Sequence, residues 1–479
     1  MTHLWQFHGG IKLDGHKTLS CEQPITQAKI PPFLTLPLLQ HKTELADPIV
    51  KVGDYVLKGQ IIAHGIHASS SGTVIAIEAR NTPHPSGLKI DCIIIETDGK
   101  DQWQELQPIS DYTKLSADEI RKHIATAGIV GLGGAGFPTH IKLKPTKIDT
   151  LIINGAECEP YITCDDRLMR ERAKEIVLGA EIISYTLAGV KSCIIAVEDN
   201  KPEAYQALLT ASANSTVEII TVPTIYPMGG EIQLIEVLTG NQISRSTIPA
   251  SIGIVVQNVE TASAVYRAIE YGEPLISRVV TITGNGINKP QNLLVLLGTP
   301  MNFVLDQCEV TSKINRLIMG GTMMGLSLPN DDIPIIKTSN CILASQETAI
   351  ATTTMPCIRC GACANVCPVK LIPQQLYWFT KAKDFEKVEQ YKIFDCIECG
   401  ACAYVCPSQI PLVNYYQYAK SEIRFNQQQQ KNSELSRQRH DFRNFRIERE
   451  KKERAERHKK AKTKAAMKAE IAKARAEKG

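Results

Sequence analysis

The string CIRCGACANVCP (357–368) recurs in the chain, nearly unchanged, as CIECGACAYVCP (396–407). Each copy has the spacing C-x2-C-x2-C-x3-C-P. A structural zinc site offers two well-separated pairs of ligands. Three closely spaced thiolates followed by a fourth suit a cubane iron–sulfur cluster instead. The repeat therefore predicts two [4Fe–4S] clusters rather than zinc or ordinary buried cysteines.

The fourth cysteine of each string is expected to bind the cluster of the other string, as it does in two-cluster runs of this type. The predicted ligand sets are Cys357, Cys360, Cys363 and Cys406 for one cluster, and Cys396, Cys399, Cys402 and Cys367 for the other. The segment between the strings is longer than in small ferredoxins. If helices occupy this segment, its length predicts an α-helical ferredoxin module.

Composition limits the class of protein. At roughly 150 residues per domain, 479 residues suggest about three to four domains. Seven of the 15 cysteines lie outside the two strings and form no disulfide-like framework, which favours a reducing compartment. We expect neither a signal peptide nor a membrane-spanning helix.

The C-terminal segment differs from the rest of the chain in its charge. From Lys431 onward, 18 basic and 8 acidic residues give a net charge of +10. This tail is too polar to form a core and is expected to be disordered or a lone charged helix. It could meet acidic lipid headgroups, RNA or an acidic protein face. We expect no nucleic acid among the partners.

Short apolar runs indicate the fold upstream of the cysteines. The segments at 50–63 and 67–78 resemble a biotinyl/lipoyl-type barrel-sandwich, but the hairpin tip lacks the lysine that would carry a cofactor, so a structural or docking role is expected. Runs such as TLIINGAE (150–157) and SCIIAVED (192–199) predict buried parallel strands. Residues 276–335 return to β structure of the β-grasp, soluble-ligand-binding type.

The predicted fold is multidomain α/β. It comprises an N-terminal barrel-sandwich hybrid (1–108), a Rossmann-like FMN- and NADH-binding domain (109–275), a β-grasp insert (276–340), an α-helical two-[4Fe–4S] ferredoxin domain (341–428) and a basic charged tail (429–479).

A glycine loop, GLGGAGFPTHIKL (131–143), matches G-x-G-x-x-G. The dinucleotide fingerprint must follow a strand. Here a helix is predicted first, from the capping-box pair Ser116 and Glu119, so the ordinary Rossmann interpretation fails and a plain glycine turn is the alternative. Three further loops rich in Gly, Asn and Glu follow strand ends, at 153–167, 226–235 and 255–262. Such loops converge at one edge of a parallel sheet, where glycines admit a phosphate or planar ring.

The four loops resemble those of the FMN- and NADH-binding subunit of respiratory complex I and its diaphorase relatives. Over about 1–425, the chain most closely resembles the family of C subunits of Rnf (Rsx) ion-translocating electron-transport complexes. The resemblance implies non-covalent FMN and oxidation of NADH. It also implies electron transfer to the other subunits of the complex, at the cytoplasmic side of the inner membrane, with ferredoxin as a further candidate partner.

The resemblance also assigns residues. The flavin phosphate and ring would lie against Gly131, Gly133, Gly134, Gly136 and Lys142. Phe137 would stack with NADH, and Glu231 would lie near the nicotinamide. The remaining loop residues are Asn154, Glu157, Glu159, Asn258 and Thr261. Leu132 departs from complex I, which has arginine there. Hydride transfer needs no acid–base pair, so no catalytic residue is assigned.

The function expected is that of a peripheral electron-input subunit, an NADH-linked oxidoreductase component. Two alternatives remain open from the sequence. The chain could be a soluble NADH diaphorase subunit of a hydrogenase or formate dehydrogenase, which would lack the N-terminal barrel and the crossed cluster pair. It could also be a cofactor-poor electron-relay or docking protein, which flavin analysis would distinguish.

Overall fold

A four-stranded parallel sheet occupies the centre of the flavin domain. Its strand order is β10-β9-β8-β11, and the strands are β10 (Val217–Val222), β9 (Ser192–Glu198), β8 (Thr150–Gly155) and β11 (Ile254–Asn258). The computed structural model describes residues 3–40, 45–84, 87–144, 147–244, 247–311, 313–348 and 353–477. All four strands fall on apolar runs, as expected for a sheet buried on both faces.

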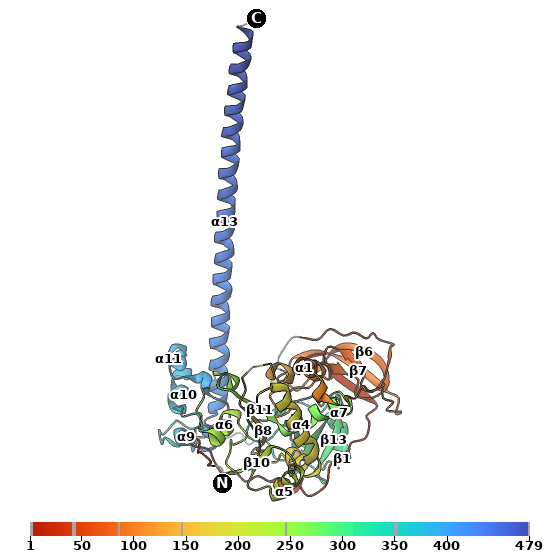
Figure 1. Cartoon of the computed structure of the whole chain (residues 1–479). Coiled ribbons are helices and arrows are strands. Elements are labelled where there is room, and N and C mark those ends of the chain that lie inside the picture. Colours follow the sequence, from red (N-terminus) through yellow and green to blue (C-terminus); the bar gives the residue numbers. More distant parts are fainter. Residues whose placement is uncertain are drawn as a thin grey trace.

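Helices cover both faces of this sheet (Figure 1). Along β8, Leu151 and Ile153 belong to the main core, together with apolar residues of α4 (Ala173–Leu187) and α7 (Val259–Glu270). Ile152 belongs to a second core with α6 (Glu231–Thr239). The alternation follows from the two-residue period of a strand. The other helices of this domain are α1 (Ala117–Thr126), α2 (Thr139–Lys142), α3 (Cys164–Glu171) and α5 (Pro202–Ala211).

The glycine loop lies between two helices. α1 begins with the predicted capping box, in which the Ser116 hydroxyl accepts from the Glu119 N–H and the Glu119 carboxylate accepts from the Ser116 N–H. α2 begins directly after the loop, at Thr139. The loop is therefore not the strand-to-helix turn of a dinucleotide fingerprint.

A six-stranded mixed sheet forms the β-grasp part. Its order is β1-β13-β12-β16-β14-β15, with β1 (Thr26–Gln27), β13 (Gln291–Leu296), β12 (Ser277–Thr283), β16 (Cys341–Ser345), β14 (Arg316–Met319) and β15 (Leu326–Leu328), and α8 (Met301–Gln307) follows β13. β1 comes from the N-terminal region, and β16 lies beyond residue 340. The sheet therefore contains the strands of the predicted insert (276–340), one strand from before it in the sequence and one from directly after it.

The N-terminal region forms a four-stranded sheet, β2-β7-β6-β3, and a two-stranded hairpin. The strands are β2 (Phe33–Pro37), β7 (Lys89–Thr97), β6 (Gly72–Asn81), β3 (Tyr55–Val56), β4 (Ile61–Ala63) and β5 (Ile66–His67). Figure 1 shows this layer at one end of the body, away from the C-terminal helices.

The C-terminal module is helical between and after the cysteine strings, as predicted. Its helices are α9 (Ala362–Asn365), α10 (Pro373–Lys381), α11 (Phe385–Gln390), α12 (Ala401–Tyr404) and α13 (Leu412–Ala476). α13 starts inside the module and then projects far from the body (Figure 1). Within the described ranges, no helix is both long enough and apolar enough to cross a membrane.

Candidate functional site

Two apolar cavities in the C-terminal module are each lined by four cysteines. One is lined by Cys357, Cys360, Cys363 and Cys406, and the other by Cys367, Cys396, Cys399 and Cys402. Each set takes three cysteines from one string and the fourth from the other. The structure thus groups the cysteines as the crossed pattern requires, while the ligation itself stays a prediction.

The chemistry of the thiols fits a cluster in each cavity. Burial raises the pKa of Cys399 to about 12 and that of Cys402 further still, and neighbouring thiolates push in the same direction. Thiolates in such a place need a cation beside them, which cluster iron supplies. Gly361 and Gly400 stand before α9 and α12 at φ +79° and +80°, a left-handed conformation that suits glycine.

The glycine loop is closed by its own backbone. The Gly131 N–H donates to the Phe137 carbonyl at 2.8 Å, and the Gly136 N–H donates to the Gly131 carbonyl at 3.0 Å. Gly134 has φ +95°, and no atom lies within 4 Å of the place a Cβ would take. A ligand can therefore reach the backbone at the tip of the loop, as an FMN cradle requires.

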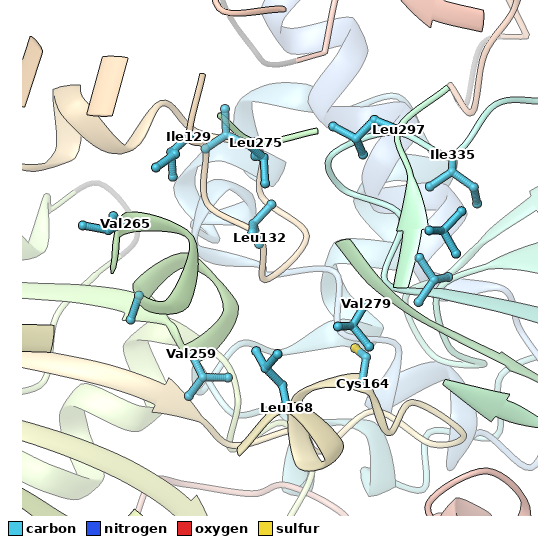
Figure 2. Packing of buried hydrophobic residues seen from close by; sticks show 14 of the residues in the cluster. Ile129, Leu132, Cys164, Leu168, Val259, Val265, Leu275, Val279, Leu297 and Ile335 are labelled. Atoms are coloured by element: carbon cyan, nitrogen blue, oxygen red, sulfur yellow. The ribbon is translucent and has the colours of Figure 1, made fainter. Parts of the chain in front are cut away.

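Leu132 anchors this loop in the core. Its side chain is buried among residues of α3, α7 and β12, including Leu168, Val259 and Val279 (Figure 2). Its N–H donates to the Thr261 hydroxyl at 3.0 Å. An arginine at this position would place a second guanidinium beside buried Arg278, which already pairs with Glu260 and donates to the Leu132 carbonyl at 3.4 Å, so leucine avoids a further desolvation cost.

The N-terminus of α7 stands beside the loop. Asn258 caps the helix by accepting from the Glu260 N–H at 2.8 Å, and its amide donates to Asp165 at 2.7 Å. A Cβ on Gly133 would lie 3.3 Å from the Asn258 Cβ. The free N–H groups of a helix N-terminus favour anions, so a phosphate at this loop would be stabilised. The residues present thus fit FMN.

Two predicted residues with different roles meet directly. Lys142, predicted at the flavin phosphate, forms an ion pair with Glu231, predicted near the nicotinamide, at 2.8 Å between Nζ and Oε1. Both side chains are partly exposed. Asn154 ties β8 to the loop before α6, because its amide donates to the Gly229 carbonyl at 2.9 Å. These three residues share one edge of the sheet.

Glu157 and Glu159 point to different places. Glu157 is buried, and its carboxylate accepts from the Asp165 N–H at 2.8 Å and lies 3.5 Å from Lys17 Nζ. Burial raises the pKa of Glu157 to about 7. Glu159 instead accepts from the backbone N–H groups of Met323 and Met324, at 2.7 and 3.0 Å.

Phe137 stands at the far end of the glycine loop. Its side chain is 42% exposed and is available to a ligand that approaches from solvent.

Three residues of the site were not found from the sequence. Lys17 donates to the carbonyls of Glu157, Glu159 and Ile162, and so shapes the second loop. Asp165 holds Asn258, and the acid-rich end of the 153–167 loop was an available signal. Tyr226 donates from its hydroxyl to the Cys399 carbonyl at 2.6 Å, and so joins the sheet edge to the cluster module.

Three protein-family models match the chain. The RnfC barrel sandwich hybrid domain matches residues 5–100, the Nuo51 FMN-binding domain matches 124–267, and the 4Fe-4S dicluster domain matches 356–410. The predicted fold class is confirmed by these matches. So are the predicted cofactors, FMN and iron–sulfur clusters.

Curated relatives match nearly the whole chain. Proteins named as the C subunit of an ion-translocating oxidoreductase complex are 49% identical in Vibrio cholerae and 46% identical in Pectobacterium atrosepticum, each over 96% of this chain. The one from Pseudomonas aeruginosa is 46% identical over 95%. The chain spans 61%, 68% and 60% of these relatives, respectively, so the first matches are longer than this chain.

Among solved structures, an NAD⁺-reducing [NiFe]-hydrogenase in the air-oxidized state is similar at a TM-score of 0.45 and 19% identity. The match covers 63% of this chain and 60% of that one. A similarity of this size supports no argument about the site.

Proposed function

Because this chain belongs to the family of C subunits of ion-translocating oxidoreductase complexes, we propose that it is the electron-input subunit of such a complex. It takes electrons from NADH and passes them, by way of FMN and two [4Fe–4S] clusters, to the other subunits. FMN when bound accepts two electrons together and releases them singly, and the clusters carry single electrons.

One observation carries this proposal. A ligand-accessible glycine loop at the edge of a parallel sheet and two cavities with four cysteines each belong to one chain. A direct hydrogen bond from Tyr226 to the Cys399 carbonyl ties the sheet edge to one of these cavities. A nucleotide oxidoreductase that feeds one-electron carriers needs this combination.

The chain's own residues have distinct tasks in this function. The N–H groups of the glycine loop and of the α7 N-terminus would hold the flavin phosphate. Lys142 and Glu231 form an ion pair in this structure. When Lys142 binds a phosphate, it must either leave Glu231 or contact both groups at once. Phe137 would cover the nicotinamide and exclude water.

The proposal is tested by NADH-dependent dye reduction with the full chain, purified anaerobically, with and without added FMN. We expect activity that requires FMN, together with about eight iron and eight acid-labile sulfide per chain. Bound FMN and iron without NADH oxidation would contradict the electron-input role. Iron without any flavin binding would favour a relay protein.

A matched pair of glycine variants sharpens the test. Gly134 and Gly189 both have positive φ, at +95° and +130°, and both have open space at the Cβ position. Valine therefore strains the backbone in either place, but only Gly134 lies in the loop. We expect Gly134→Val to lose FMN and Gly189→Val to keep it. Equal FMN loss in both would mean that backbone strain alone is responsible.

We also propose a peripheral position on the cytoplasmic side of the inner membrane, with the other subunits of the complex as partners. The family name supports membership of a complex. Protease treatment of oriented membrane vesicles tests the side, because only a chain on the exposed face is digested. No observation favours the diaphorase alternative over this proposal.

A further inference from the structure

The two cysteine cavities differ in their surroundings. Cys367, Cys396, Cys399 and Cys402 are all buried, whereas Cys360 of the other set is exposed. We call the buried set the inner set, and the set of Cys357, Cys360, Cys363 and Cys406 the outer set. The repeat in sequence therefore does not produce two equivalent environments.

The flavin domain and the N-terminal segment cover the inner set. Tyr226 donates to the Cys399 carbonyl at 2.6 Å, and the His8 ring donates to the Cys367 carbonyl at 2.9 Å. Ile11 forms backbone hydrogen bonds with Tyr226 in both directions, and the Gly10 N–H donates to the Val366 carbonyl. The inner set is therefore enclosed on the side of the predicted flavin loops.

The repeat makes the contrast specific, residue by residue. In the second string, Ile397 packs against a group of buried side chains that includes Tyr226 and Ile11. Glu398 forms an ion pair with Lys420 at 2.6 Å. Their counterparts in the first string are Ile358 and Arg359. Ile358 is 68% exposed, and in the described part of the chain no acidic side chain forms an ion pair with Arg359.

Ile358, Arg359 and Cys360 line the outer cavity, and Met355 lies beside it, because its N–H donates to the carbonyl of Ser408, another lining residue, at 3.0 Å. We call Met355, Ile358, Arg359 and Cys360 the rim. Met355 is 57% exposed. A scattered exposed side chain needs no explanation, but two large exposed apolar side chains beside an exposed cysteine of the outer set fit a contact site. Electron-transfer encounters typically use small surfaces of this kind.

We infer that this rim is the docking surface for a second redox protein, which covers Ile358 as the flavin domain covers Ile397. The inference rests on the proposed function. In this arrangement, the cluster of the inner set exchanges electrons with the flavin. The cluster of the outer set exchanges electrons with the docked protein. That protein carries a one-electron redox centre near its surface, an apolar patch for Ile358 and Met355, and a carboxylate for Arg359.

The transfer at this surface is balanced without further reactants. One electron passes between the outer cluster and the centre of the docked protein. One is oxidised as the other is reduced, and no bond forms or breaks.

The asymmetry is tested on the full chain loaded with both clusters. A soluble dysprosium chelate accelerates the electron-spin relaxation of a paramagnetic centre that it can approach. We expect faster relaxation, in power-saturation EPR, for the outer cluster only, identified by its loss in Cys363→Ser. Equal relaxation of both clusters would overturn the inference. About eight iron and NADH–dye reduction in the same sample test the proposed function separately.

The docking surface is tested with Ile358→Glu, and Ile248→Glu is the control because Ile248 is 71% exposed elsewhere on the surface. Holoprotein is added to membranes that contain the other subunits of the complex but lack this chain, and reduction of their redox centres by NADH is followed. We expect Ile358→Glu to slow this reduction by about tenfold or more, since a carboxylate would be buried unpaired in the contact. Iron content should be unchanged in both variants. Because Ile358 lines the outer cavity, Met355→Glu, which lies outside the lining, should slow the membrane reaction as well.

A photo-crosslinker distinguishes the possible occupants. With benzoylphenylalanine at position 358 in the assembled complex, a link to another protein of the complex that carries its own redox centre supports the inference. A link to lipid or to a second copy of this chain, or an unchanged membrane reduction rate in Ile358→Glu, overturns it.

Discussion

At the scale of single residues, Cys367 is separated from the cysteines nearest to it in the sequence and joins those of the second string. We expect Cys367→Ser to damage the cluster bound by Cys396, Cys399 and Cys402, and to leave the other intact. Iron should fall from about eight to about four per chain, and EPR should lose one of two signals. Cys308→Ser is the control, because Cys308 is buried but lines neither cavity. Loss of the outer-set signal alone would refute the crossed ligation.

Glu157 gives a pH dependence of stability. Burial raises its pKa from the ordinary 4.5 to about 7 in the folded chain, so between these values the folded state binds more protons than the unfolded state. The protonated Glu157 carboxyl therefore makes its full contribution to the free energy of unfolding below about pH 4.5. As the pH rises to about 7, this free energy falls by about 3 kcal/mol. Asp165, with a pKa raised to about 6, adds a slope of the same sign.

We expect Glu157→Gln to reduce this slope in the FMN-free protein, because glutamine can still accept from the Asp165 N–H but does not titrate. Urea unfolding at pH 5 and pH 7.5 measures the difference. An unchanged pH dependence in the variant would show that the Glu157 carboxyl does not titrate in this range. Glu105→Gln, at an exposed position with no ion pair among the described residues, should leave the slope as in the wild type.

At the scale of elements, α13 has a buried first part and an exposed second part. Its first turns bury Leu412, Tyr416, Ala419 and Ile423 in the cluster module, and Lys420 donates to the Cys396 carbonyl at 2.7 Å. From Lys431 to residue 477 nearly every side chain is exposed. A lone charged helix of this kind was one of the two outcomes predicted for the tail.

Truncation before Lys431 should therefore leave iron content, FMN and NADH–dye reduction unchanged. Tyr416→Ala should instead lower iron retention, because it removes a buried aromatic side chain and its 2.7 Å hydrogen bond to the Pro373 carbonyl. Iron analysis after gel filtration measures both. Iron loss on truncation would show that the projecting part supports the module.

The +10 charge of this segment also allows electrostatic docking to the membrane complex. If it docks, truncation should lower the fraction of protein recovered with membranes, and salt should mimic the loss. Unchanged recovery of the truncated protein over a salt series would leave the segment as a solvated extension.

At the scale of the whole molecule, Tyr226 links the flavin domain to the cluster module. Tyr226→Phe leaves the Cys399 carbonyl without this donor, at a cost of about 1–3 kcal/mol. We expect faster hydrogen exchange at the contact and a changed EPR line shape of the inner cluster, with iron content retained. Tyr205→Phe on α5 is the matched control, since within the described residues its hydroxyl donates no hydrogen bond to the module. No change in either measurement would show that the contact does not hold the two parts together.

The sequence by itself determined the features that depend on local spacing. Two strings with four cysteines each predict the ligands of two clusters, Ser116 and Glu119 define a helix start, and apolar runs such as 150–157 define buried strands. The tertiary structure decided what depends on distant partners. Lys17 and Glu157 meet across 140 positions, and Leu132 anchors its loop through Thr261. The two near-identical strings supply one fully buried set and one set with an exposed cysteine, because the flavin domain and the N-terminal segment cover the first of these sets. Local sequence cannot encode such a difference, because burial is set by which surfaces meet in the folded chain.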